Sequence, residues 1–182
     1  MKPMGTAMKL TQTLVLRDPD NAGHAARVTE LALRIADAVG AEPRRIRAIK
    51  AGGPLHDIGK LELDRAILDK PGALDPEEIE EIRTHPELGA RMLHGIRSLR
   101  ASLDCVLHHH ERWDGTGYPY GLDGERIPLE ARILAVADAY DAMTSHRPYR
   151  DPRSHEEALA EVERCSGSQF DPQVARAFLT LA

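Results

Sequence analysis

One stretch decides how this chain is interpreted: His108-His109-His110-Glu111-Arg112-Trp113-Asp114-Gly115-Thr116-Gly117-Tyr118-Pro119. Three consecutive histidines, an acid and a loop of glycine and proline are poorly suited to a hydrophobic core. Imidazole and carboxylate groups are common metal ligands, and irregular loops often carry binding residues. The stretch therefore predicts a metal site that continues into a binding loop.

The chain offers further candidate ligands outside this stretch. They are His24, the adjacent pair His56 and Asp57, His85 and Asp138. A buried carboxylate is costly without a cation, so Asp138 in its apolar helix requires a positive partner; a salt bridge or a helix cap is the alternative to a metal. A lone histidine such as His24 or His85 is more often a satisfied core or surface residue than a ligand. The joint pattern nevertheless favours ligands for more than one cation.

The composition favours a single domain. The chain has 182 residues, of which 42% are hydrophobic and 4% aromatic, and no Gly/Ser/Pro-rich linker or charge block divides it. A chain of this length can bury one core. The formal net charge of −5 argues against binding of a nucleic acid polymer, which needs a basic surface. Because Cys105 and Cys165 have no partner in CxxC spacing, we expect two buried, reduced thiols.

Two features of the sequence bear on location. No run approaches the ~20 apolar residues that are needed to cross a bilayer. The N-terminus lacks the apolar core of a signal peptide. We therefore expect a cytoplasmic protein that does not bind membranes.

Helical periodicity recurs through most of the chain. Apolar residues follow a helical period over residues 22–39, 43–56, 88–99, 101–110 and 129–143. Helix starts are marked by Asp75 before Pro76, by Ser154 with Glu157 three positions on, and by Asp171 before Pro172. No segment shows the alternation that is typical of a strand. The sequence therefore predicts an all-α helical bundle with its chemistry on facing helices.

The breaks between these helices are also informative. Gly40 is expected to end the first helix, and His85-Pro86 marks a boundary between two helices. Gly52-Gly53-Pro54 interrupts the helix that leads to the His56-Asp57 pair, and a kink there could displace both ligands. Residues 60–72 are predicted to be irregular, and residues 114–128 are predicted to be rich in turns.

Adjacent ligands can serve two metals. Side chains of neighbouring residues diverge by about 100° around a helix, so His56 and Asp57 can serve different ions if a carboxylate bridges them. The same holds for His109 and His110. Neutral imidazole with carboxylate oxygen suits Fe, Mn, Ni or Zn. Two metals about 3.5–4 Å apart clamp the attacking and leaving oxygens at phosphorus, and they lower the pKa of bound water to ~7. The predicted chemistry is hydrolysis of a phosphate ester.

An ordered set of motifs carries a family resemblance. The set consists of His56-Asp57-Ile58-Gly59-Lys60, His85-Pro86, His109-His110-Glu111, Asp114-Gly115-Thr116-Gly117-Tyr118-Pro119, Asp138 and Arg147-Pro148-Tyr149-Arg150. It resembles the HD-GYP domain, a branch of the HD phosphohydrolase superfamily that hydrolyses cyclic di-GMP. The resemblance implies one all-α domain over residues 16–182, with a Gly/Pro-rich GYP loop, preceded by an N-terminal extension of residues 1–15.

The resemblance also implies the ligands of two divalent ions, with iron or manganese expected. The ligands are His56, Asp57 and Asp138 for one ion and Asp57, His85, His109 and His110 for the other. Asp57 is the bridge between the ions and the centre of catalysis.

A third ion is implied for some members of the family. His24, together with Asp20 four residues earlier, is the expected ligand pair for it. His108 precedes the paired histidines and is expected either to support the ligands or to be exposed.

Other residues are implied as contacts to the substrate. Lys60 steadies the scissile phosphate and takes part in catalysis. Arg147 and Arg150 clamp the other phosphate, with a solvated surface pair as the alternative. Asp141, one turn after Asp138 and grouped with the substrate contacts, is expected to orient a ligand or an arginine, with an exposed position as the alternative. The loop Gly117-Tyr118-Pro119 either lines the nucleotide pocket or contacts a GGDEF-domain partner. The rings of Trp113 and Tyr118 could stack on guanine or pack beneath the loop.

The leading hypothesis is a metal-dependent phosphodiesterase of bacterial signalling. It would hydrolyse cyclic di-GMP to pGpG and, in a further step, to GMP, by in-line attack of a hydroxide held between the metals. One alternative is an HD phosphohydrolase for another nucleotide, such as 3',3'-cGAMP. The other is a non-catalytic module that senses cyclic di-GMP or docks a GGDEF-domain protein. A homodimer is a candidate assembly.

Overall fold

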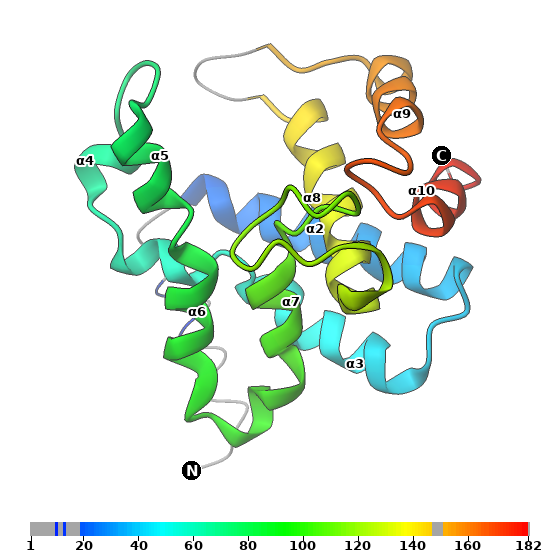
Figure 1. Cartoon of the computed structure of the whole chain (residues 1–182), viewed down its shortest axis with the longest axis horizontal. Coiled ribbons are helices and arrows are strands. Elements are labelled where there is room, and N and C mark those ends of the chain that lie inside the picture. Colours follow the sequence, from blue (N-terminus) through cyan, green and yellow to red (C-terminus); the bar gives the residue numbers. More distant parts are fainter. Residues whose placement is uncertain (1–9, 11–12, 14–18, 147–150, 182) are drawn as a thin grey trace.

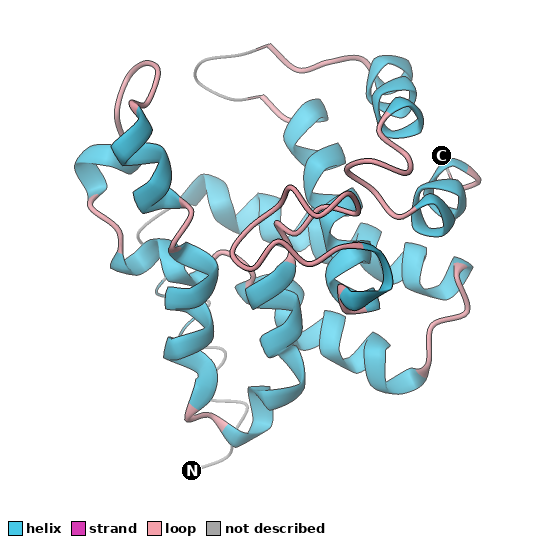
Figure 2. Cartoon of the chain, in the orientation of Figure 1, coloured by secondary structure: helices cyan, strands magenta, loops and turns pink. Residues whose placement is uncertain are grey.

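The computed structural model of the chain describes residues 10, 13, 19–146 and 151–181, with the side chains of residues 19–22 left aside. These residues form helices joined by loops, as Figure 2 shows. The described residues contain no strand, and their β-type pairing is limited to the isolated bridges Asp114–Asp123 and Ser166–Phe170. The prediction of an all-α domain is confirmed. The predicted boundary between residues 15 and 16 lies outside the described residues.

Most of the helices follow one another with short connections, and the connection from α7 to α8 is long. The 3-10 helices are labelled η. The order is α2 (Pro19–Ala38), α3 (Pro43–Gly52), η1 (Gly53–Leu55), η2 (Ile58–Glu62), α4 (Arg65–Leu68), α5 (Pro76–Ile82), α6 (His85–His94), η3 (Arg97–Ser102), α7 (Leu103–His108), η4 (Gly124–Arg126), α8 (Leu129–Thr144), α9 (His155–Arg164) and α10 (Pro172–Leu179).

Two groups of helices meet in the middle of the molecule. Helices α2 and α8 pack against each other, and α9 and α10 cover α8 on one side. Helices α6 and α7 lie side by side, and α6 also packs against η2 (Figure 1). The long loop from α7 to α8 crosses the centre of the molecule between these groups (Figure 2). This arrangement brings α7 close to α8.

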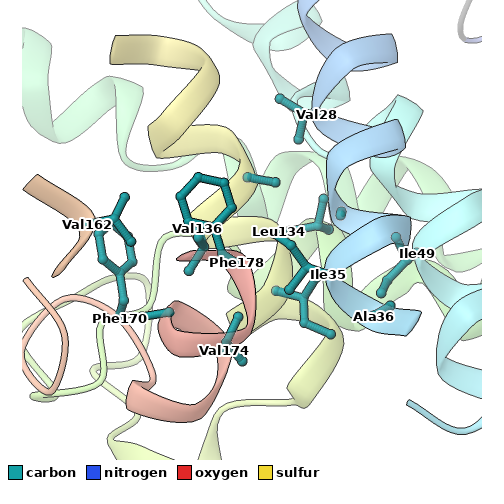
Figure 3. Close-up of a cluster of buried hydrophobic side chains, with 14 of the residues drawn as sticks. Val28, Ile35, Ala36, Ile49, Leu134, Val136, Val162, Phe170, Val174 and Phe178 are labelled. Carbon is teal, nitrogen blue, oxygen red and sulfur yellow. The ribbon is translucent and has the colours of Figure 1, made fainter. Parts of the chain in front are cut away.

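Each group has its own apolar core. The larger core is formed mainly by α2, α3, α8, α9 and α10, with Ile35, Leu134 and Val174 fully buried (Figure 3). The smaller core consists of residues from η1, η2, α6, η3 and α7, namely Leu55, Ile58, Leu93, Leu99 and Val106. The predicted thiols are both buried and free of disulfides. Among the described residues, no helix has the length and apolarity to cross a membrane.

Several of the predicted helix ends are confirmed. Asp75 and Ser154 each begin a helix with a complete capping box, and Asp171 caps α10 through its side chain. Gly40 follows the end of α2 with a φ of 65°, a conformation that favours glycine. These signals act within one turn of helix, so the local sequence is sufficient to set them.

The predicted interruption at Gly52-Gly53-Pro54 is confirmed, because α3 changes into η1 there and the His56-Asp57 pair lies between η1 and η2. Two other predictions about the helices were wrong. Residues 60–72 are not wholly irregular, since they include the end of η2 and the short helix α4. The helix predicted over residues 101–110 ends at His108, so the two following histidines lie beyond it.

Close approach of backbones explains the interrupted helix before His56. A Cβ atom on Gly53 would lie 2.5 Å from Thr29 Oγ1 on α2, and one on Gly52 would lie 2.6 Å from Cys105 Cβ on α7. Neither distance is sterically tolerable for a carbon atom. The two glycines thus let the chain at the junction of α3 and η1 approach α2 and α7, and η1, which leads to His56, packs against α2.

Gly59 makes the tightest of these approaches. A Cβ atom there would lie 1.9 Å from the backbone oxygen of His85 and 2.6 Å from the backbone nitrogen of Gly89. We therefore predict that Gly59→Ala lowers the free energy of unfolding by about 3 kcal/mol or more, because two backbones must separate. Chemical denaturation of the purified chain measures this.

Gly95→Ala is the matched control for this substitution. Gly95 has a φ of −77° and no atom within 4 Å of a built Cβ, so alanine should change the free energy of unfolding by less than about 1 kcal/mol. Equal stability of the two variants would contradict the proposed role of Gly59.

Candidate metal centre

The predicted ligands that the structure describes lie close together between α2, α6, α7 and α8. They come from many elements: His24 from α2, His56 and Asp57 from the joint between η1 and η2, His85 from the first turn of α6, His109 and His110 from just beyond α7, and Asp138 from α8. The side chain of Asp20 lies outside the described residues.

One group of ligand atoms is centred on Asp57 and α6. Asp57, His85, His109 and His110 offer ligand atoms that all lie within 4.8 Å of one another. His85 Nε2 is 3.3 Å from Asp57 Oδ1 and 3.3 Å from His109 Nε2. The two consecutive histidines therefore join a single group, contrary to the divergence that helical spacing suggested.

A second group shares the same carboxylate. His24, His56 and Asp57 also offer ligand atoms within 4.8 Å of one another. His56 Nε2 lies 3.6 Å from Asp57 Oδ2, and His24 Nε2 lies 3.1 Å from Asp138 Oδ1. Asp57 thus belongs to both groups, as a bridging carboxylate must.

The hydrogen bonds of the histidines fix which nitrogen can bind a metal. Nδ1 of His56, His85 and His109 lies 2.7, 2.7 and 2.9 Å from the backbone oxygens of Gly53, Ile82 and Val106, respectively. A carbonyl oxygen only accepts, so each Nδ1 donates, and in a neutral ring Nε2 is left with a lone pair. Each of these carbonyls lies three residues earlier, near the end of a helix, where helical donors are missing.

Two observations show that these lone pairs lack a protein partner. His56 Nε2 is buried and has no hydrogen-bond partner among the described residues. His85 Nε2 and His109 Nε2 face each other at 3.3 Å although both are acceptors. Acceptors that converge in a buried site require a cation, so the residues present fit a metal.

The protonation states of the first group suit metal binding. Burial raises the pKa of Asp57, but Lys60 and the surrounding histidines outweigh it and hold the pKa well below its usual range. Burial lowers the pKa of His85 and His109, and it lowers that of His110 to about 3. An ionised carboxylate among neutral imidazoles is the form in which these groups ligate divalent metals.

A carboxylate and an arginine orient His24. Its Nδ1 lies 2.7 Å from Asp141 Oδ2, and Arg27 donates to both oxygens of Asp141 at 2.5 and 2.9 Å. Burial lowers the pKa of His24, but the hydrogen bonds to Asp138 and Asp141 outweigh it and raise the pKa to about 9. Asp141, predicted beside the substrate, thus orients His24. Arg27 was missed, although its place one turn after His24 on the same helix was a usable signal.

The predicted phosphate contacts are only partly described. Lys60 Nζ lies 2.6 Å from Asp57 Oδ2, so its ammonium group stands next to the shared carboxylate. Arg147 and Arg150 lie outside the described residues. His108 is 9% exposed, and its Nδ1 lies 3.8 Å from Glu111 Oε1. His108 belongs to neither of the two groups of ligand atoms.

The GYP loop packs directly on the ligands. The ring of Tyr118 stacks on that of His110 at 4.8 Å between centroids and 26° between planes, and the guanidinium carbon of Arg83 lies over the Tyr118 ring at 5.5 Å. A Cβ atom on Gly117 would lie 2.6 Å from the backbone oxygen of His110. Pro119 follows a cis peptide bond. The aromatic ring of the loop is therefore engaged by the protein itself.

A buried acid, Glu111, anchors this loop. Glu111 is 3% exposed, and its two carboxylate oxygens accept from the backbone N–H groups of Tyr120 and Leu122 at 2.9 and 3.1 Å. The sequence placed Glu111 in a motif without giving it a role, because its partners are backbone groups of a loop. The carboxylate fixes the loop that borders the metal ligands.

We predict that Glu111→Ala destabilises the protein by about 2–3 kcal/mol, since two backbone N–H groups lose a charged acceptor. Thermal unfolding and limited proteolysis of the segment 114–128 measure the change. Glu125→Ala is the control, because Glu125 is exposed on η4. A protease-resistant loop in Glu111→Ala would contradict the anchoring role.

A small cavity opens beside the ligands. It has a volume of about 160 Å³. Its lining residues are His109, His110, Glu111, Arg112, Tyr118, Ala135, Asp138, Ala139 and Gln169. It joins the ligand groups to the GYP loop and α8, so a substrate could reach the metals there.

We predict that His109→Ala lowers metal affinity at least about 10-fold, because a direct ligand is lost from the centre of one group. Elemental analysis of the purified chain and competition with a chelator measure this without any activity assay. His94→Ala, an exposed histidine at the end of α6, should bind metal as the unmodified chain does. Unchanged metal content in His109→Ala would refute its assignment as a ligand.

Comparison with known proteins identifies the family. A family model described as "HD domain" matches residues 9–174. The chain therefore belongs to the HD domain family. Its resemblance to the HD-GYP branch of that family is confirmed by its relatives.

A cyclic di-GMP phosphodiesterase of Thermotoga maritima is 45% identical over 167 residues, which cover 91% of this chain and 45% of the relative. A 3'3'-cGAMP-specific phosphodiesterase 2 of Vibrio cholerae is 34% identical over 172 residues, which cover 93% of this chain and 33% of the relative. The chain thus spans less than half the length of these relatives. An HDG"Y"P protein from Bdellovibrio bacteriovorus shares the fold, with a TM-score of 0.71 at 20% identity over 88% of this chain and 52% of that one.

Proposed function

We propose that this chain is a metal-dependent phosphodiesterase that hydrolyses cyclic di-GMP to pGpG and then to GMP. The observation that carries the proposal is the shared carboxylate of Asp57 between two groups of ligand atoms. Paired metals with a common ligand are a recurring solution for in-line displacement at phosphorus. The names of the curated relatives support the substrate class.

For one ion we assign the first group, Asp57, His85, His109 and His110. For the other ion we assign His56, Asp57 and Asp138; the second group holds His24 beside His56 and Asp57, and Asp138 Oδ1 lies 3.1 Å from His24 Nε2. His24 and Asp20 are proposed for a third ion. When bound, the ions supply a nucleophile from water and neutralise charge on the phosphate. The histidines contribute by presenting Nε2 lone pairs whose direction is fixed by the carbonyls behind them. Imidazole and carboxylate ligands without thiolate support iron or manganese.

Lys60 is proposed as the residue that binds the scissile phosphate. Its ammonium group already lies beside Asp57, so a phosphate that reaches the shared carboxylate also reaches Lys60. Arg147 and Arg150 are proposed for the second phosphate, because paired guanidinium groups bind phosphate oxygens in a fork.

The GYP loop is proposed to line the substrate pocket. Tyr118 lies on the ligand His110 and borders the cavity, which favours this use over contact with a GGDEF-domain partner. We also propose a cytoplasmic location, where the nucleotide substrate would be found, and a homodimer as the assembly.

A second candidate substrate is 3',3'-cGAMP. It shares the two 3'-linked phosphates of cyclic di-GMP and differs in one base, and a relative specific for it matches 93% of this chain. The metal centre would cleave either compound, so the bases must decide between them.

We predict that anaerobically purified chain, with at least two iron or manganese ions per chain, converts cyclic di-GMP into pGpG or GMP. Asp57→Asn should lower the rate on the order of 10³-fold, because several kcal/mol of charge stabilisation are lost with the bridge. Chromatography of the products over time measures both rates.

Asp37→Asn is the matched control, because Asp37 is exposed at the end of α2. It should leave the rate unchanged. Full metal loading with tight binding of uncut cyclic di-GMP would instead indicate a sensor module. Preferential cleavage of 3',3'-cGAMP would favour the second substrate.

A further inference from the structure

The loop between α9 and α10 returns to the metal centre. The backbone N–H groups of Trp113 and Asp114 donate to the backbone oxygens of Gln169 and Ser168 at 3.1 and 2.8 Å. The start of the predicted binding loop is thus held by a segment more than fifty residues later in the chain. Gln169 also lines the cavity beside the ligands.

This later loop is fixed in place on both sides. The backbone oxygen of Cys165 accepts from the N–H groups of Ser168, Gln169 and Phe170. Phe170 is 2% exposed and belongs to the larger core (Figure 3), and Asp171 caps α10. The backbone of Gln169 is therefore held from both directions, and its side chain starts from a defined position.

Gln169 lines the cavity and carries a carboxamide without a partner among the described residues. Its backbone N–H donates to Cys165 and its backbone oxygen accepts from Trp113, so both main-chain groups are satisfied. Its side chain is half-buried and makes no hydrogen bond with any residue that the structure describes. Arg112, another polar residue of the cavity, has its guanidinium group bonded to Asp114 and Thr116.

One part of the cavity wall, on α8, is apolar and suits a flat group. Ala135 and Ala139 lie one turn apart on α8, on either side of the position of Asp138, and both line the cavity. The volume of about 160 Å³ is below the range of roughly 300–1,000 Å³ for a pocket that encloses a whole drug-sized ligand. The cavity would therefore take one part of a cyclic dinucleotide, and a base next to the metals is the part with a flat apolar face.

From these observations we infer that Gln169 is a specificity-determining residue that binds a nucleobase of the substrate. The inference rests on the proposed function. A carboxamide presents an acceptor and a donor side by side, so its oxygen accepts from an amino group of the base while its NH₂ group donates to a neighbouring acceptor. The alanines of α8 receive the face of the base, and Gln169 binds its edge.

The test compares binding and hydrolysis of cyclic di-GMP and cyclic di-AMP by metal-loaded chains, since each compound carries two identical bases. Gln169→Ala should raise KM for cyclic di-GMP roughly 10-fold while kcat and metal content stay within about 3-fold of the unmodified chain. Gln169→Glu offers acceptors only. This substitution should weaken the binding of cyclic di-AMP more than the binding of cyclic di-GMP, because guanine presents adjacent N–H donors on one edge.

Gln173→Ala is the matched control, because Gln173 is exposed on α10 and close in sequence. It should leave KM and base preference unchanged. Unaltered KM and base preference in both Gln169 variants would overturn the inference while leaving the phosphodiesterase in place. Loss of kcat together with metal would also overturn it, because Gln169 would then be a structural residue.

Calorimetric binding separates the remaining outcomes. If the unmodified chain binds cyclic di-GMP without cleaving it, the phosphodiesterase proposal fails, and a roughly 10-fold loss of affinity in Gln169→Ala still supports the inference. If the metal-loaded chain neither binds nor cleaves either compound, both proposals fail.

Discussion

The structure depends on one buried carboxylate that is surrounded by acceptor nitrogens. Asp57 is 4% exposed, and it is faced by the imidazole Nε2 atoms of the neighbouring His56 and of His85 and His109 from two other segments of the chain. Lone pairs and negative charge gathered in a low-dielectric site repel one another unless cations join them. Lys60 supplies one positive charge at the edge of this group. This repulsion makes the site unfavourable for folding, and bound divalent metals would relieve it.

Carbonyl groups at helix ends orient three of the histidine ligands. His56, His85 and His109 each follow the end of a helix, and each donates Nδ1–H to the carbonyl three residues earlier. In the middle of a long α-helix that carbonyl would already accept a helical N–H. The same effect results from the interruption at Gly53, the start of α6 and the short α7. They provide free carbonyls that fix the tautomer and direction of each ligand.

Hydrogen bonds to backbone N–H groups also hold the loops around the site. Glu111 satisfies two N–H groups of the GYP loop, and Gln169 satisfies one at the start of it. Tyr118 covers His110, so the loop and the ligands are a single packed unit. Such support from neighbouring groups is what metal sites need to hold their geometry. A substrate that enters the cavity meets a surface that is already arranged.

The sequence alone determined the family, the helical class and the identity of the candidate ligands. Histidine and aspartate in an ordered set are chemically specific, and the capping signals at Asp75 and Ser154 act within one turn. Tertiary structure decided how the ligands are presented. The break at Gly53 depends on Thr29, the orientation of His24 depends on Asp141, and the place of Gln169 depends on Trp113. These partners are far apart along the chain, and local periodicity carries no information about contacts that form only when the helices pack.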